Sequence, residues 1–240
     1  VEDFRQLFDD PAWRPDYLKI YPTLVVDDTV TYDMYRRGEF EPLSSERAAE
    51  VVAEVMRALP RYVRLQRVQR DIPADHIEAG VQKSNLRQLA WQVMDERGWD
   101  CSCIRCREVG MNDAEPDTVE LDTIEYEAAG GTEQFISYED FEQDLLVGFC
   151  RLRFPSQPTR RELQDAALVR ELHVYGNEVG VGGAEGEDGS HQHQGYGRTL
   201  LREAERRARE AGYRKLSVIS GIGVREYYRE KLGYFQDGPY

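Results

Sequence analysis

The hydrophobic pattern of the chain changes near Thr118, and this change limits the folds open to it. Before that point, "PTLVV" and "RYVRLQRV" predict strands, while "SSERAAEVVAEVMRAL" and "SNLRQLAWQVMDERG" predict helices. Alternating strands and helices are typical of a parallel sheet with crossover helices. After that point, "TVELDTIEYEA", "EQFISYE" and "DLLVGFCRLRFP" follow one another, which predicts antiparallel strands. We therefore expect an α/β region followed by an α+β region.

The first predicted helix, "SSERAAEVVAEVMRAL", has clear signals at both ends. Ser44 or Ser45 can cap its N-terminus through the hydroxyl, and Pro60 follows its end. In "RYVRLQRV", apolar and basic side chains alternate, so we expect a half-buried strand whose arginines share one face. The later helix, "SNLRQLAWQVMDERG", has a polar start and Gly98 at its end.

The C-terminal region continues with the predicted strand "AALVRELHVYG" and an acidic, Gly-rich loop. A helix predicted over 198–211 places Leu200, Leu201, Ala204 and Ala208 on one apolar face. The segments "KLSVISG", "VREYYREKLG" and "YFQDGPY" then predict a strand, a helix and a final strand.

The charge of the chain limits its partners. A net charge of −14 argues against a general nucleic-acid coat protein, because neutralising phosphates requires clustered cations. The run "RALPRYVRLQRVQR" is an exception, since it has five arginines and no acidic residue. Solvated arginines and a phosphate-facing patch both remain open for this run.

The sequence shows no membrane or secretion signal. No apolar run is long enough for a membrane span, and the first residues do not resemble a signal peptide, so we expect a cytoplasmic protein. The missing initiator Met and the abrupt end lead us to expect a fragment of a longer protein.

Three of the four cysteines stand together in "CSCIRC": Cys101, Cys103 and Cys106. Without a secretory signal, metal binding is a better interpretation than a disulfide framework. Thiolates at this spacing can converge on one tetrahedral Zn²⁺, with a remote side chain or water as the fourth ligand. A redox C-x-x-C pair is the weaker alternative, and Cys150, among apolar neighbours, is expected in the core.

The turn "QHQGYG" at 192–197 precedes the predicted helix 198–211. A helix start presents unpaired N–H groups and a partial positive charge, and both attract phosphate. Gly195 and Gly197 allow close approach of a ligand because they lack Cβ. The turn is neither G-x-x-x-x-G-K-[ST] nor G-x-G-x-x-G. Its pattern, Q-x-x-G-x-G, resembles the pyrophosphate loop of GNAT acetyltransferases. His191 and His193 are best explained as loop residues.

Longer stretches carry a more specific resemblance: "LKIYPTLVV", "RLQRVQRDIPADHIEAGVQKSNLRQL", "CSCIRCREVG", "ALVRELHVYG", "QHQGYG" and "VISGIGVREYYREKLGY". Together they resemble the Elongator catalytic subunit family, the tRNA uridine acetyltransferases. The resemblance implies the C-terminal part of a radical-SAM α/β barrel at 1–98, a cysteine-rich zinc loop and linker at 99–117, and a GNAT domain at 118–240. It implies acetyl-CoA as the acyl donor. It also implies SAM and a [4Fe-4S] cluster for the radical step that forms a carboxymethyl-type wobble uridine.

The resemblance also implies site residues. The acetyl-CoA site would use Gln192, His193, Gln194, Gly195, Tyr196 and Gly197, together with the strand residues Leu172, His173, Val174 and Tyr175. Tyr227 or Tyr228 would hydrogen-bond or protonate the departing thiolate, with a packing role as the alternative. Glu171 is a weaker candidate for a base.

The resemblance further implies a structural zinc at the cysteines and tRNA as the main partner. Contacts to RNA phosphates would come from Arg61, Arg64, Arg67, Arg70, Lys83, Arg87, Arg105 and Arg107. Further partners would be Elongator-type accessory subunits or a second copy of the chain.

The chain departs from the family pattern in three places. It has no C-x-x-x-x-C-x-x-C motif, so the ligands of the iron–sulfur cluster are not among its residues. Its last helix reads "YYREKLGY" where the family usually has "YYRKLGY". The extra Glu230 would rotate Tyr228 by about 100° away from its usual face unless a bulge absorbs it. The chain also ends at "GPY", where family members continue briefly.

Two other functions remain open at this stage. A protein lysine acetyltransferase would use the same GNAT half, and an acidic groove beside the thioester would favour it. A non-catalytic module that binds acetyl-CoA or tRNA is the second. A basic surface that continues from Arg61 to Arg105 would favour an RNA substrate.

Overall fold

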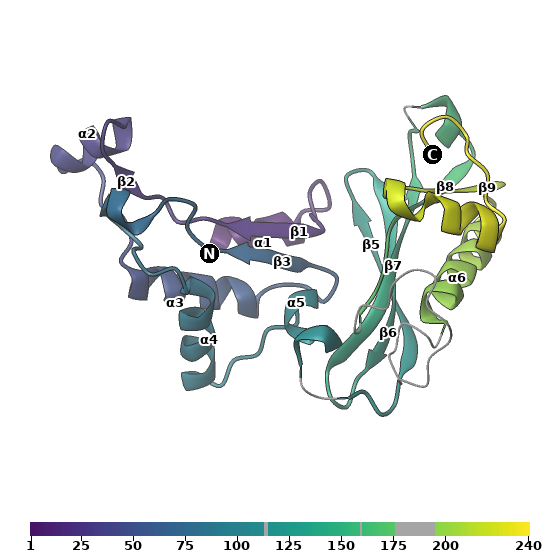
Figure 1. The fold of residues 1–240 in the computed structure, drawn as a ribbon, viewed down its shortest axis with the longest axis horizontal. Helices are drawn as coiled ribbons and strands as arrows, with labels where there is room; N and C mark the ends of the chain where they lie inside the picture. Colours follow the sequence, from purple (N-terminus) through teal and green to yellow (C-terminus); the bar gives the residue numbers. More distant parts are fainter. Residues whose placement is uncertain (113–114, 159, 176–194) are drawn as a thin grey trace. The chain divides into compact units, whose positions relative to one another are not determined.

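The computed structural model describes residues 1–112, 115–158, 160–175 and 195–240 (Figure 1). The chain divides into two compact units. Unit 1 contains Val1–Asp10 and Pro15–Cys106, and unit 2 contains Pro11–Arg14 and Arg107–Tyr240. Among the described residues, no helix is long and apolar enough to cross a membrane.

Unit 1 contains two small sheets and several helices. Strands β1 (Tyr17–Ile20) and β3 (Arg64–Val68) pair in parallel, and β2 (Val25–Val26) pairs with β4 (Ile77–Ala79) in antiparallel orientation. The helices are α1 (Glu2–Asp9), α2 (Val30–Arg36), α3 (Ser45–Arg57), α4 (Leu86–Glu96) and, at the unit boundary, α5 (Ile104–Arg107), with a 3₁₀ turn η1 (Ala74–His76). The parallel β1–β3 pair with helices between its strands confirms the α/β character expected for this region.

Helices α3 and α4 pack against each other and follow the predicted pattern. The Ser44 hydroxyl accepts the backbone N–H of Arg47 at 3.2 Å, which identifies Ser44 as the N-cap of α3. The apolar faces of both helices are buried, through Val52 and Met56 in α3 and Ala90 in α4. Local periodicity was therefore sufficient to predict both helices.

Strand β3 is less regular than its sequence predicts. Leu18 pairs with Leu65, but Lys19 pairs with Arg67, so Gln66 forms a β-bulge. The bulge keeps Arg64 and Arg67 on one face and buries Leu65 and Val68 on the other. Without a bulge, residues three apart would point to opposite faces. Arg61 precedes the strand, so the predicted common face does not extend to it.

Unit 2 is built on one five-stranded sheet. Its order is β5 (Glu120–Ala128), β6 (Gly131–Asp140), β7 (Leu145–Pro155), β8 (Ala166–Val174) and β9 (Lys215–Val218). The first four strands are antiparallel and β9 is parallel to β8, which agrees with the predicted α+β organisation. Helix α6 (Tyr196–Glu210) covers one face of the sheet (Figure 1). Short 3₁₀ turns, η2 (Val109–Met111), η3 (Arg161–Leu163) and η5 (Ile222–Val224), lie between the longer elements.

The core of unit 2 lies between α6 and the sheet. The predicted apolar face of α6 is buried against residues of β6 to β9, which include Ile136, Leu152 and Val169. Burying one such side chain contributes about 1.5–3 kcal/mol. Cys150 belongs to this core, as expected, and burial raises the pKa of its thiol to about 12.

The last segment of the chain does not form the predicted strand. Its backbone turns back on itself, since the amides of Asp237 and Tyr240 each donate to the carbonyl of the other. Gly238 has a φ of 61°, a left-handed conformation that a strand does not contain. Lys215 forms an ion pair with Asp237 and so attaches this turn to β9.

Candidate functional site

Strands β8 and β9 diverge part of the way along the sheet. Their ladder runs from Ala166↔Lys215 to Val169↔Val218, whereas β8 continues along β7 to Val174. The divergence coincides with a bulge in β8, because Arg151 pairs with Glu171 but Leu152 pairs with Val169. Parallel strands that separate in this way leave backbone groups of one strand open to a ligand.

The end of β8 is held firmly on its other side. The Tyr175 amide donates to the Val147 carbonyl at 2.8 Å, and the rings of His173 and Tyr175 have centroids 4.4 Å apart. Leu172 and Val174 are half-buried against the core beneath α6, while His173 is exposed. The backbone of Leu172, His173, Val174 and Tyr175, the residues predicted to bind acetyl-CoA, therefore lies beside the gap where β9 leaves β8.

The start of α6 lies next to the end of β8. Gly195 is the N-cap, with a φ of 77°, and its carbonyl accepts the amides of Arg198 and Thr199 at 3.0 and 3.1 Å. A Cβ on Gly197 would lie 3.6 Å from Cγ2 of Val174, which places the first turn beside β8. Gln192, His193 and Gln194, also predicted for this site, lie outside the described residues.

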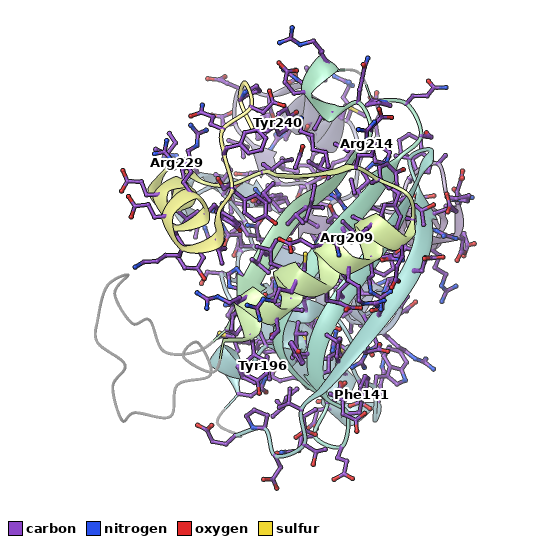
Figure 2. All side chains as sticks on the ribbon, turned by 90° about the vertical axis from the view of Figure 1, so that its right-hand side faces the viewer. Phe141, Tyr196, Arg209, Arg214, Arg229 and Tyr240 are labelled. Carbon is purple, nitrogen blue, oxygen red and sulfur yellow. The ribbon has the colours of Figure 1, made fainter. Side chains whose placement is uncertain are left out.

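The first turn of α6 suits an anion. No side chain of the described residues caps it, and it contains no acidic residue. Unpaired N–H groups and the positive end of the helix dipole attract a negatively charged ligand. The ring of Tyr196 packs against Tyr138 of β6 at 4.7 Å and holds the helix start, which Figure 2 shows at one end of α6 with Arg209 toward the other.

The two candidate tyrosines lie on an unusual helix. Residues Tyr227–Lys231 form a π-helix, η6, at the position of the extra Glu230. A π-helix has more residues per turn than an α-helix, so it takes up one added residue locally. Tyr228 consequently still packs against the core of unit 2, and its carbonyl accepts the amide of Tyr234 at 3.0 Å.

Tyr227 and Tyr228 differ in environment. Tyr227 is 39 % exposed, whereas Tyr228 lies on the wall of a cavity of about 560 Å³. The same cavity is lined by Arg209, Arg214, Arg229 and Tyr240 (Figure 2). Burial raises the pKa of Tyr228 to about 12, so its hydroxyl stays protonated at neutral pH. Of the two, Tyr228 is the one that combines packing against the core with a place on the wall of the cavity.

Glu171, the weaker candidate for a base, is already engaged by another side chain. Its carboxylate accepts a hydrogen bond from Nε of Arg151 at 2.9 Å, and Arg151 is only 1 % exposed. The arrangement supports an ion pair within the sheet rather than a base beside the thioester.

The three clustered cysteines form a second site, in unit 1. Their sulfur atoms all lie within 4.8 Å of one another, and Sγ of Cys103 is 3.7 Å from Sγ of Cys106. Sulfurs bound to one tetrahedral Zn²⁺ at about 2.3 Å are about 3.8 Å apart, so this spacing fits a metal ion. Among the described residues, the cluster contains no fourth His, Cys, Asp or Glu ligand.

The cysteine loop is attached to the edge of β3. The amide of Ile104 donates to the carbonyl of Val63 at 2.9 Å, and the backbone of Leu65 hydrogen-bonds to Cys103. Hydrogen bonds from Cys101 and Cys106 lower the pKa of Cys103 despite its burial, and the Leu65 backbone lowers it further. The same hydrogen bonds and burial raise the pKa of Cys101, so the negative charge of the metal-free cluster lies mainly on Cys103. Metals bind the thiolate form, so a metal ion would favour the loss of the remaining thiol protons.

The predicted RNA-binding residues lie in different environments. Arg67 is exposed, and Lys83 is exposed beside Glu46 at 3.3 Å. Arg61, Arg64 and Arg105 are half-buried. Lys19, which the sequence did not single out, is exposed and pairs with Arg67 in the ladder. The strand pattern of "YLKI" is the signal that could have identified it.

Three members of the predicted set are directed into the protein. Arg107 is 1 % exposed and forms an ion pair with buried Glu139 at 2.6 Å, so its assignment as an RNA contact is wrong. Arg70 binds the carbonyls of Ile72 and Gln82 and thereby shapes the loop after β3. Arg87 donates to the carbonyl of Leu65, at the edge where the cysteines attach.

Comparison with known proteins defines the class of this chain. Residues 105–234 match the acetyltransferase (GNAT) family, and residues 15–96 match the radical-SAM C-terminal domain. The GNAT match covers more than half of the chain, so the chain belongs to the GNAT acetyltransferase family.

Individual relatives identify a more specific family within this class. The tRNA uridine(34) acetyltransferase of Methanocaldococcus infernus is 48 % identical over 99 % of this chain and 46 % of that relative. Elongator complex protein 3 of Schizosaccharomyces pombe is 45 % identical over 100 % of this chain and 45 % of that relative. The solved structure of archaeal Methanocaldococcus infernus Elp3 with an N-terminal deletion (1–46) superposes with a TM-score of 0.92 at 48 % identity, covering 100 % of this chain and 57 % of that one.

The chain therefore belongs to the family of tRNA uridine(34) acetyltransferases and Elongator catalytic subunits, as its motifs predict. The predicted fold, the C-terminal part of the radical-SAM region followed by a GNAT domain, is confirmed as well. The chain spans less than half the length of the curated relatives that it matches.

Proposed function

We propose that this chain is the acetyl-CoA-binding and tRNA-binding part of an enzyme that modifies uridine 34 of tRNA to a carboxymethyl-type base. One observation carries the proposal: within a GNAT unit, the diverging end of β8 lies beside the uncapped, glycine-containing start of α6. The names of the relatives support tRNA as the substrate.

In this proposal the two parts of the site hold different parts of acetyl-CoA. The N–H groups of the first turn of α6 bind the pyrophosphate, which Gly195 and Gly197 allow to approach the backbone. The backbone of β8 beyond Val169 pairs with the amides of the pantetheine arm. The hydroxyl of Tyr228 donates its proton to the thiolate that leaves when the thioester is cleaved.

The tRNA would be positioned by cations of unit 1. Arg64, Arg67 and Lys19 lie on one face of the β1–β3 pair, which the bulge at Gln66 makes continuous. Together with Lys83, Arg61 and Arg105 they would contact phosphates, which orients an RNA without reading its sequence. Arg70, Arg87 and Arg107 are left out of this set because their guanidinium groups are directed toward protein groups.

We propose Zn²⁺ for the cysteine site, with a structural role, because three thiolates at tetrahedral spacing suit this ion. SAM and a [4Fe-4S] cluster would supply the radical that forms the bond at carbon 5 of the base. This chain lacks the C-x-x-x-x-C-x-x-C motif, and its C-x-C-x-x-C cysteines do not match that spacing, so none of its residues is assigned to the cluster.

We further propose the cytoplasm as the place of action, and Elongator-type accessory subunits or a second copy of the chain as partners. We propose three domain ranges for the chain. Residues 1–98 form the barrel part, 99–117 the zinc loop and linker, and 118–240 the acetyltransferase domain.

Hydrolysis of acetyl-CoA by this chain, measured with and without tRNA, tests the proposal. We expect CoA to bind in both cases and hydrolysis to increase when tRNA is present. Equal turnover without tRNA, together with acetylation of a lysine peptide, would instead identify a protein acetyltransferase. Tight binding of CoA with no turnover in either case would identify a binding module.

A further inference from the structure

Arg87 differs from the surface arginines because its guanidinium is directed toward the edge of β3. Its Nη2 donates to the carbonyl of Leu65 at 2.7 Å. Its Nη1 is buried and has no hydrogen-bond partner among the described residues. A buried donor without a partner costs about 1–3 kcal/mol, so its presence calls for an explanation.

The cysteine site lies beside this guanidinium. Leu65 connects the two, since its backbone hydrogen-bonds to Cys103 while its carbonyl accepts Arg87. Burial lowers the pKa of Arg87, but negative charge on Cys103, Cys106 and Cys101 acts in the opposite direction and stabilises its positive charge. The guanidinium is therefore close enough to interact with all three sulfurs.

Helix α4 contributes a second group to the same site. Trp91 lies one helical turn after Arg87, and its side chain hydrogen-bonds to Cys106. Cζ of Arg87 lies 5.9 Å from the centre of the Trp91 ring. Two neighbouring positions on one face of α4 thus face the cysteine loop.

The charge of a metal-loaded site explains this arrangement. Three thiolates around a divalent cation leave one net negative charge, which is costly in a partly buried site without compensation. One guanidinium balances it, and its planar N–H groups can bind a carbonyl and a sulfur at once. Arg105 is a second cation nearby, but it is half exposed and belongs to the loop itself.

We infer that Arg87 is the counter-charge of the cysteine metal site and anchors that site to β3 through Leu65. The inference rests on the metal site proposed above and assigns Arg87 a positioning role, exerted through the thiolates. Outer groups that hydrogen-bond metal ligands typically contribute about 10- to 100-fold to metal affinity. Arg87 is expected to contribute an amount in this range.

Metal affinity and the spectrum of bound Co²⁺ test the inference without any assay of activity. The 240-residue chain and its variants Arg87→Gln, Arg87→Lys and Arg97→Gln are titrated with Zn²⁺ against a chromophoric chelator, and then with Co²⁺. For Arg87→Gln we expect about 10- to 100-fold weaker binding of Zn²⁺ and a shifted thiolate-to-Co²⁺ absorption band. Arg87→Lys keeps the charge and should recover part of the affinity. Arg97, just after α4, is paired with Trp99, so Arg97→Gln should match the wild type.

The outcomes separate this inference from the metal site itself. If the wild type binds no metal, the proposed site is wrong and the inference is lost with it. If the wild type binds metal and Arg87→Gln binds it equally well with the same Co²⁺ spectrum, the site stands and the inference is wrong. Should Arg87→Gln fail to fold by circular dichroism, Arg87→Met takes its place, since it also removes the charge: a loss of about 10- to 100-fold in Zn²⁺ affinity supports the counter-charge, and wild-type affinity with an unchanged Co²⁺ spectrum contradicts it.

Discussion

Replacing Gly197 with alanine should weaken binding of acetyl-CoA without harming the fold. The φ of Gly197 is not in the left-handed region, so alanine can adopt the same backbone. The added Cβ would lie 3.6 Å from Cγ2 of Val174, an ordinary contact, and no other heavy atom of the described part of the chain lies within 4 Å. Alanine also has the higher helix propensity, so stability should be unchanged or higher by at most about 1 kcal/mol.

The loss in affinity follows from the proposed pyrophosphate site. A methyl group on the first turn of α6 occupies space through which the phosphates approach the backbone N–H groups. One hydrogen bond to a charged group contributes about 1.5–3 kcal/mol. Losing one such bond therefore corresponds to about 10- to 100-fold weaker binding of acetyl-CoA.

Isothermal titration calorimetry with two ligands tests this reasoning. Acetyl-CoA contains the pyrophosphate, whereas S-acetyl-pantetheine lacks it, so only the first ligand should bind Gly197→Ala more weakly. Gly110→Ala is a matched control, because its glycine lies in the helical turn η2 and a Cβ there meets no atom of the described residues within 4 Å. Unchanged affinity for acetyl-CoA in a folded Gly197→Ala protein, or an equal loss for both ligands, would refute the site.

Three further changes test the other parts of the proposal. Tyr228→Phe should lower the rate of acetyl-CoA hydrolysis by about 10²- to 10⁴-fold while leaving CoA affinity intact. Tyr227→Phe should have little effect, and equal losses would contradict the assignment. Because the pKa of Tyr228 is raised to about 12, the hydroxyl stays protonated below that pH, so a pH profile of the rate should show no loss from this group up to pH 10. Deleting Glu230 should convert the π-helix to an α-helix with turnover retained, and a loss as large as that of Tyr228→Phe would show that the added residue is required. Arg67→Glu should weaken tRNA binding and reduce its salt dependence without changing CoA affinity, whereas charge reversal at Arg206, on the exposed side of α6, serves as the control.

Local patterns in the sequence were enough to predict much of the fold. The Ser44 cap of α3 and the apolar stripes of α3 and α6 depend on residues three or four apart, and both helices agree with prediction. The hairpin of β5 and β6 could also be predicted from the sequence, because Gly130 and Gly131 mark its turn. Motif resemblance, rather than periodicity, supplied the family.

Features that depend on distant partners could not be predicted in this way. The bulge at Gln66 is defined only by pairing with β1, nearly fifty residues earlier in the chain. Arg107 stands next to other charged residues in the sequence, so it was assigned to the surface. Its partner, Glu139, lies on β6 and is distant in sequence. Arg87 was likewise assigned to RNA. The carbonyl to which it donates belongs to Leu65, which is not a neighbour in sequence, so local patterns could not predict this contact.

The attachment of the cysteine loop to β3 also has a consequence for aggregation. An open strand edge presents unpaired backbone groups to which another chain can add. Here the carbonyl of Val63 and both backbone groups of Leu65 are used by Ile104, Cys103 and Arg87. The metal proposed for this loop would therefore also keep this edge covered, and a loop released by chelation would leave a strand able to join two molecules edge to edge.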